Sequence, residues 1–104
     1  STWEVEGTAA RSVLTKCAVF DNPTKETFTG LAQVKATFDA RPLNSTYVLG
    51  NAPADLRSED LANVKATVKD VEGADYSDAF TVRVKDGKIV LSNARPSGMT
   101  IFVR

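Results

Sequence analysis

The sequence predicts an all-β domain, a small antiparallel sandwich or barrel of about seven to nine short strands. Three observations predict it. Apolar and polar residues alternate in short runs along the whole chain, many of these runs contain β-branched residues, and turn-forming residues separate them. One short helix is expected near residues 53–63. The 104 residues contain no linker or shift in composition, so we expect a single domain, 1–104.

The clearest predicted element is a β-hairpin in the last third of the chain. Two runs rich in β-branched residues, 80–84 and 88–91, flank the dipeptide Asp86-Gly87. Glycine accepts the positive φ that a tight hairpin turn requires. A further strand is predicted from Met99 to Val103, after a turn at 96–98.

The N-terminal part predicts a second hairpin. Residues 12–20 alternate as a strand, with one face made of Val13, Thr15, Cys17 and Val19. Pro23 ends this strand because it cannot donate a ladder hydrogen bond. The alternation resumes at 27–29, so the hairpin is predicted over 12–29.

Two central segments fit both a strand and a helix. Alternation at 34–38 and 64–71 favours strands, but Leu61, Val64, Val68 and Val71 also recur at helical spacing. Ser58 is a possible helix cap. We favour a strand at 64–71 with a short helical turn between 53 and 61, and leave 31–40 and 58–70 open between strand and helix.

The stretch from Val64 to Val84, a strand, an acidic loop and a strand, resembles the pattern of bacterial immunoglobulin-like repeats. This resemblance implies a sandwich architecture and no particular site residue.

Net charge and cysteine content limit the partners and the cellular compartment that we expect for this protein. Thirteen basic residues balance thirteen acidic ones, so no net field attracts nucleic acid or anionic membrane. The lone cysteine, Cys17, cannot form an intramolecular disulfide, which favours a reducing compartment. No apolar run approaches the ~20 residues of a membrane helix. We therefore expect no membrane partner, and a protein that is cytoplasmic or incorporated in a particle assembled in the cytoplasm.

The residues that usually carry chemistry are scarce. The chain has no histidine, which removes the commonest general base and most zinc sites. Cys17 is predicted to be a buried core residue. The acidic segment with Asp70, Glu72, Asp75 and Asp78 is interpreted as a solvated turn rather than a calcium site. We expect no enzyme, no cofactor and no metal.

The function predicted first is a non-catalytic structural or interaction module, such as a subunit or accessory protein of a viral particle. It would bind a protein partner or assemble with itself, and Trp3 is a candidate anchor as well as a candidate core residue. The alternative is a β-barrel that binds single-stranded nucleic acid through basic and aromatic side chains. Its candidate residues are Lys65, Lys69, Arg83, Lys85, Lys88, Trp3, Tyr47, Tyr76 and Phe80. A weaker alternative is a protein inhibitor acting through the loop 50–55.

Overall fold

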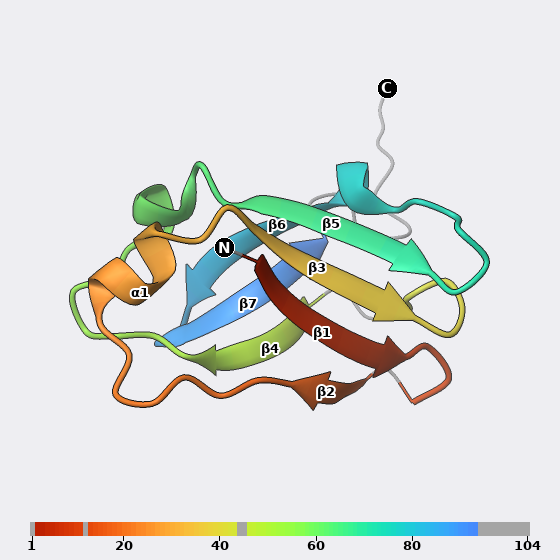
Figure 1. Ribbon diagram of the computed structural model, residues 1–104, viewed down its shortest axis with the longest axis horizontal. Coiled ribbons are helices and arrows are strands. Elements are labelled where there is room, and N and C mark those ends of the chain that lie inside the picture. The colour runs from red at the N-terminus through yellow and green to blue at the C-terminus, as the bar shows by residue number, and fades with distance from the viewer. Residues whose placement is uncertain (1, 12, 44–45, 94–104) are drawn as a thin grey trace, which may run out of the picture.

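The computed structural model describes residues 2–11, 13–43 and 46–93, and these residues form a two-layered β-sandwich (Figure 1). The first sheet, sheet A, has the strand order β2-β1-β3-β5. The second, sheet B, has the order β4-β7-β6. The strands of sheet A are β1 (Thr2–Thr8), β2 (Val13–Cys17), β3 (Gln33–Phe38) and β5 (Lys65–Asp70). Those of sheet B are β4 (Thr46–Asn51), β6 (Phe80–Lys85) and β7 (Lys88–Asn93). The prediction of an all-β sandwich is confirmed.

The direction of pairing in sheet A differs from the antiparallel expectation. Sheet B and the β1–β2 pair are antiparallel, but β1 pairs with β3, and β3 with β5, in parallel. Between each parallel pair the chain makes an intervening strand and a helical turn, which bring it back in the original direction. Alternation within a strand reports which face is buried and carries no information on the direction of its neighbour.

The predicted hairpin at Asp86-Gly87 is confirmed. β6 and β7 pair from Phe80 opposite Asn93 to Lys85 opposite Lys88, leaving a two-residue turn. Both turn residues have positive φ, 52° at Asp86 and 76° at Gly87. This is the conformation of a type I′ turn, whose twist matches that of the strands.

The predicted hairpin over 12–29 is wrong, because residues 27–29 belong to the short helix α1 (Lys25–Thr29). The hydroxyl of Thr27 accepts the backbone N–H of Thr24 at 3.0 Å, which closes the first turn of the helix. Phe28 is the buried residue of α1. Three alternating residues were too few to distinguish a strand from one helical turn.

The strand predicted at 12–20 is shorter and its two faces are not as predicted. Lys16 lies opposite Glu6 and Leu14 opposite Gly7, so Thr15 is an extra residue in a β-bulge. The bulge shifts the alternation by one residue. Leu14 and Cys17 both pack against the core, and Val13 is exposed.

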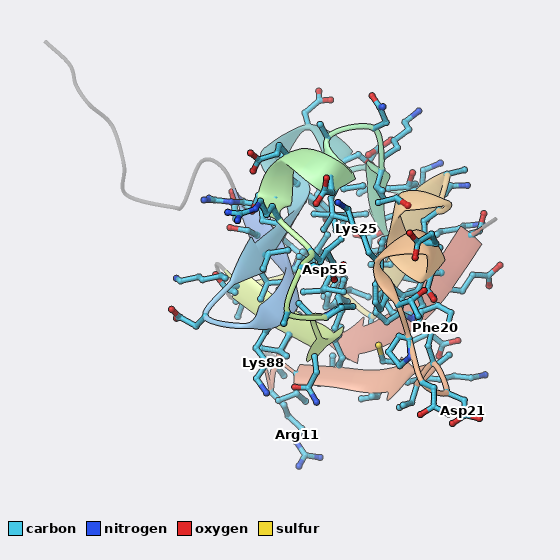
Figure 2. All side chains as sticks on the ribbon, turned by 90° about the vertical axis from the view of Figure 1, so that its left-hand side faces the viewer. Arg11, Phe20, Asp21, Lys25, Asp55 and Lys88 are labelled. Atoms are coloured by element: carbon cyan, nitrogen blue, oxygen red, sulfur yellow. The ribbon has the colours of Figure 1, made fainter. Side chains whose placement is uncertain are left out.

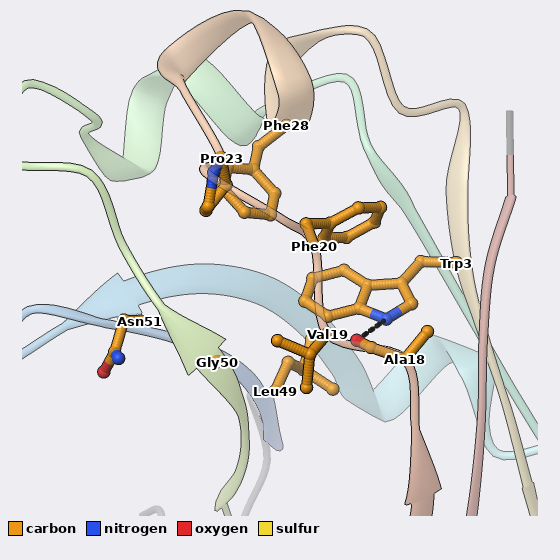
Figure 3. Close-up of a pocket in the computed structure, with 9 residues that line it drawn as sticks. All are labelled: Trp3, Ala18, Val19, Phe20, Pro23, Phe28, Leu49, Gly50 and Asn51. Carbon is orange, nitrogen blue, oxygen red and sulfur yellow. Dashed lines mark hydrogen bonds between the residues drawn. The ribbon is translucent and has the colours of Figure 1, made fainter.

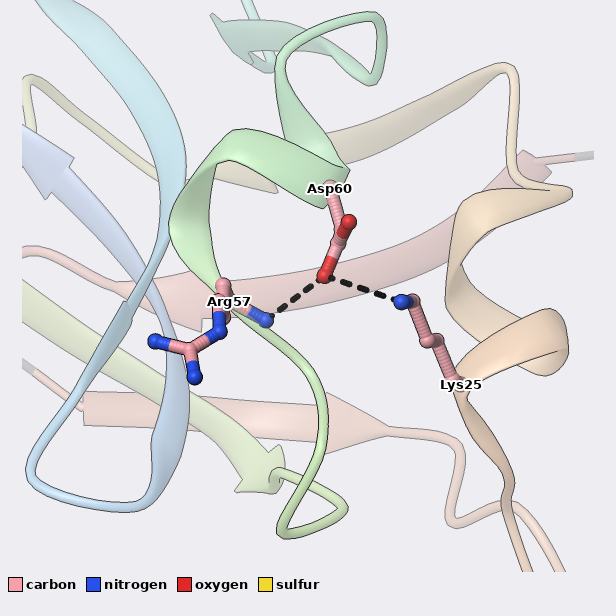
Figure 4. A network of polar contacts seen from close by, with 3 residues as sticks. All are labelled: Lys25, Arg57 and Asp60. Atoms are coloured by element: carbon pink, nitrogen blue, oxygen red, sulfur yellow. Dashed lines mark hydrogen bonds and ion pairs between the residues drawn. The ribbon is translucent and has the colours of Figure 1, made fainter.

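The structure decides the two central segments that were left open between strand and helix, and it confirms the favoured strand at 64–71 with a helical turn before it. β3 and β5 are strands, and the 3₁₀ helix η1 spans Ser58–Leu61. Ser58 is not its cap. Instead the backbone N–H of Arg57 donates to Oδ2 of Asp60 at 2.9 Å, and Asp60 also pairs with Lys25 of α1 at 3.7 Å (Figure 4). The strand predicted from Met99 to Val103 lies outside the described residues.

The core fills the space between the inner faces of the two sheets. Strands β1, β3 and β5 send alternate side chains inward, and several of these side chains are fully buried. Phe38 of β3 is 0% exposed, and its ring lies 5.0 Å from that of Tyr47 in β4. This contact joins β3 of sheet A to β4 of sheet B.

Two serine hydroxyls cover the edge strands on the β5–β6 side of the sandwich. Ser58 Oγ accepts the backbone N–H of Val84 at 3.0 Å and donates to its carbonyl at 3.1 Å. Ser77 Oγ, in the 3₁₀ helix η2 (Ser77–Ala79), accepts the N–H of Val68 at 2.8 Å. Main-chain groups that are bonded in this way cannot pair with a strand of another molecule, so β5 and β6 are protected against edge-to-edge association at these two positions.

We expect Ser58→Ala to lower the free energy of unfolding by about 1–2 kcal/mol, because it leaves a part-buried N–H and carbonyl of Val84 unpaired. Urea denaturation measures the change. Glu59→Ala, which truncates an exposed neighbour in the same 3₁₀ helix, is the control and should cost no more than about 0.5 kcal/mol. Equal losses in the two variants would show that the hydroxyl cap contributes nothing.

Candidate functional site

An apolar hollow lies on the opposite side of the sandwich, near the edge strands β2 and β4. Its volume is about 190 Å³, and it opens between the segment that follows β2 and the end of β4 (Figure 3). The residues that line it are Trp3, Ala18, Val19, Phe20, Pro23, Phe28, Leu49, Gly50 and Asn51. Apolar side chains dominate this list, so the hollow suits an apolar group.

Three aromatic rings form one wall of the hollow. The ring of Trp3 lies 4.8 Å from that of Phe20 and 5.8 Å from that of Phe28, measured between centroids. Phe20 and Phe28 meet edge to face at 5.5 Å. Trp3 is 3% exposed, which supports the prediction that it packs on its own core. Its ring also borders the hollow.

The segment 18–23 forms the outer wall. Trp3 Nε1 donates to the carbonyl of Ala18 at 3.2 Å and so holds this segment over the indole (Figure 3). Asn22 has a φ of 46°, and Pro23 follows it, so the chain turns sharply here toward α1. Val19, between these two fixed points, is 93% exposed.

The end of β4 forms the facing wall, and it leaves room at Gly50. A Cβ placed on Gly50 would lie 3.8 Å from Cη2 of Trp3, an ordinary contact distance, so a larger side chain there would project toward the hollow. Next along the strand, Asn51 Oδ1 accepts a hydrogen bond from Nζ of Lys88. A cation is therefore hydrogen-bonded to one of the residues that line the hollow.

Cys17 connects the two edge strands on this side. Its Sγ–H donates to the carbonyl of Leu49 at 3.3 Å. Burial raises the pKa of the Cys17 thiol above its ordinary value, which keeps it protonated and a poor nucleophile. The residue is half-buried and packs against the core, close to the core role predicted from the sequence.

The predicted basic and aromatic residues do not meet in one groove. Lys65 and Lys69 are exposed on the outer face of sheet A, whereas the exposed Arg83, Lys85 and Lys88 belong to sheet B. Among the aromatic candidates, Tyr47 is 2% and Phe80 is 5% exposed. Trp3 is buried as well, so Tyr76 is the one aromatic candidate with a ring exposed enough for a base to stack on it.

Tyr76 belongs instead to the acidic segment, whose carboxylates build the turn. Asp70 accepts hydrogen bonds from the N–H groups of Glu72 at 2.9 Å and Ala74 at 3.0 Å, and from the hydroxyl of Tyr76 at 2.7 Å. Asp75 accepts the N–H of Ser77 at 2.8 Å. Within the ranges that the structure describes, no group of three or more acidic or cysteine side chains is placed to hold a metal ion.

The hydrogen bond between Asp70 and Tyr76 makes the stability of the protein depend on pH. The Tyr76 hydroxyl, followed by backbone N–H groups, holds the pKa of Asp70 below its ordinary value, and the same bond raises the pKa of Tyr76. A lowered carboxyl pKa adds stability above about pH 4, and this is lost as the pH falls through the folded value. A raised tyrosine pKa adds stability below about pH 10 and loses it as the pH rises further.

We therefore expect the melting temperature of wild type to fall more between pH 6 and pH 2 than the melting temperature of Asp70→Asn. Tyr76→Phe removes one of the three donors and should show an intermediate loss. Identical acid dependence in wild type and Asp70→Asn would contradict this account of the turn.

Sequence reasoning did not single out the residues of the hollow other than Trp3 and the segment 50–55. Phe20 and Phe28 fell within predicted strands, and Val19 was assigned to one face of a strand that ends at Cys17 in the structure. Aromatic residues at 3, 20 and 28 were the available signal, but nothing in their spacing predicts that they meet.

No helix in the described parts of the chain is long and apolar enough to cross a membrane. Comparisons of the chain with protein-family models, with curated proteins and with solved structures found no match.

Proposed function

We propose that this protein is a non-catalytic interaction module that binds a partner polypeptide through the hollow between β2 and β4. The observation that carries the proposal is an apolar hollow bordered by a valine that is 93% exposed. Burying a valine side chain gains about 1.5–3 kcal/mol, and a partner seated on the hollow would realise this gain.

The difference between the two sides of the sandwich supports the same proposal. On the β5–β6 side, Ser58 and Ser77 satisfy main-chain groups of the edge strands. On the β2–β4 side, a thiol hydrogen bond from Cys17 to Leu49 spans the two edges, and the apolar hollow remains accessible. A partner would therefore find its contact surface on the β2–β4 side.

The proposal includes a place in a larger assembly, such as a viral particle, formed in the cytoplasm. The lone Cys17 supports a reducing environment, since the chain has no second cysteine to pair with. Binding of single-stranded nucleic acid has less support, because the basic candidates are divided between two sheets and Trp3 and Tyr47 are buried. Two of the loop residues considered for an inhibitor, Gly50 and Asn51, line the hollow, so they would belong to the same contact surface.

Two valine substitutions test the proposal. Val19 and Val71 are both exposed, at 93% and 68%, but Val19 borders the hollow and Val71 lies in the turn after β5. Immobilised wild type, Val19→Asp and Val71→Asp are incubated with a lysate of the native host, and the bound proteins are compared by quantitative mass spectrometry.

We expect a protein retained by wild type and Val71→Asp to be reduced at least tenfold on Val19→Asp, as expected for a desolvated contact at an interface. Urea denaturation of all three proteins checks that each is folded. Equal retention on the two variants would contradict the proposed surface, as would a retained protein that Val71→Asp loses instead.

A further inference from the structure

We infer that the hollow accepts one aromatic side chain of the partner polypeptide, with a carboxylate close to that ring. This inference rests on the proposed function, since it names the chemistry of the group that fills the same hollow. Size, the character of the walls and the local charge each contribute to it.

The size of the hollow suits a single ring. Its volume is about 190 Å³, and apolar cavities of about 150 Å³ are known to take up benzene. Phe20 and Phe28 already pack edge to face with each other, and Trp3 lies within contact distance of both. An added ring can adopt the same arrangements, which stabilise aromatic pairs by about 0.5–1.5 kcal/mol beyond the area they bury.

The polar groups at the mouth favour a negative charge. Asn51 uses its Oδ1 to accept from Lys88, which directs the donor end of its amide away from that bond. Among the described residues Lys88 is in no salt bridge. Asp21, the acidic residue of the outer wall, lies well apart from Lys88 (Figure 2). A carboxylate beside the ring would be attracted to the Asn51–Lys88 side.

The experiment uses N-acetylphenylalanine as the probe, because it carries one ring and one carboxylate and no positive charge. Trp3 is the only tryptophan of the chain and borders the hollow, so its fluorescence reports occupancy directly. We expect a saturable change in emission with half-saturation on the order of millimolar, as usual for so small a ligand. N-acetylalanine, which lacks the ring, should give no saturable change.

Removing the carboxylate or its partner should weaken binding by a similar factor. N-acetylphenylalanine amide on wild type, and N-acetylphenylalanine on Lys88→Gln, are each expected to bind about threefold to fivefold more weakly. Lys85→Gln removes an exposed lysine that lies opposite Lys88 in the hairpin, and it is the matched control. Equal affinity of the acid and the amide, or equal effects of the two lysine variants, would overturn the assignment of a carboxylate.

Filling the hollow should abolish binding altogether. Gly50→Leu projects a side chain toward Trp3, and Gly50→Ala is a smaller change that keeps the experiment informative if the leucine variant does not fold. The absence of any saturable response in wild type, or full binding to folded Gly50→Leu, would overturn the aromatic occupant. Loss of partner retention on Val19→Asp together with no probe binding would leave the contact surface standing and reject only the aromatic chemistry.

Discussion

Replacing Gly7 by alanine is expected to destabilise the protein by about 3 kcal/mol or more. An added Cβ would lie 2.4 Å from Cε2 and 2.8 Å from Cδ2 of Phe38, and 3.0 Å from the carbonyl oxygen of Val13. Phe38 is 0% exposed and packed against Tyr47, so its ring has no free space into which to move. Urea denaturation, or loss of soluble protein on expression, measures the effect.

Two further variants separate this clash from a general cost of losing glycine. Gly50→Ala meets its nearest neighbour at 3.8 Å and should change stability little or raise it by about 0.4–1 kcal/mol. In the background of Phe38→Leu, which removes the clashing ring atoms, Gly7→Ala should cost clearly less than in wild type. An equal cost in both backgrounds would place the strain elsewhere than at Phe38.

Truncating Trp3 to alanine is expected to lower the free energy of unfolding by about 3–5 kcal/mol. The side chain is 3% exposed, contacts Phe20 and Phe28, and donates a hydrogen bond to Ala18. The variant loses this packing and also the tie that holds segment 18–23 over the ring. Urea denaturation followed by circular dichroism, which does not need the tryptophan signal, gives the value.

The control for Trp3→Ala is Val19→Ala, which changes another residue that lines the hollow. Because Val19 is 93% exposed, truncation should change the stability of the free protein by less than about 0.5 kcal/mol. A large loss in Val19→Ala would show that this valine is part of the core of the isolated protein. A small loss in Trp3→Ala would mean that the aromatic wall is not needed for folding.

The sequence was sufficient to predict the elements whose signals are local. The turn Asp86-Gly87 determines the register of β6 and β7 through its own backbone preferences, and alternation placed the inner residues of β3 and β5 correctly. The helical turn before Leu61 was also predicted, although its actual cap is Arg57 with Asp60 rather than Ser58. Each of these features depends on residues a few positions apart.

The features that the sequence did not reveal depend on pairing between distant segments. The bulge at Thr15 is defined by the position of β1 opposite β2, and it decides that Cys17 faces inward and Val13 outward. The parallel pairs of sheet A join strands that long connections separate in the sequence. The hollow joins residues near positions 3, 20, 28 and 50, so no local pattern predicts it.

The parallel arrangement of β1, β3 and β5 has a consequence for how the chain reaches its native state. Thr2 lies opposite Gln33, and Gln33 lies opposite Lys65, so the inner strand β3 has two partners that are both remote in sequence. Each pairing requires closure of a long loop before any contact compensates the lost chain entropy. The hairpin of β6 and β7 closes over two residues and should form within microseconds. We therefore expect the seating of β3 between its two neighbours to set the folding rate.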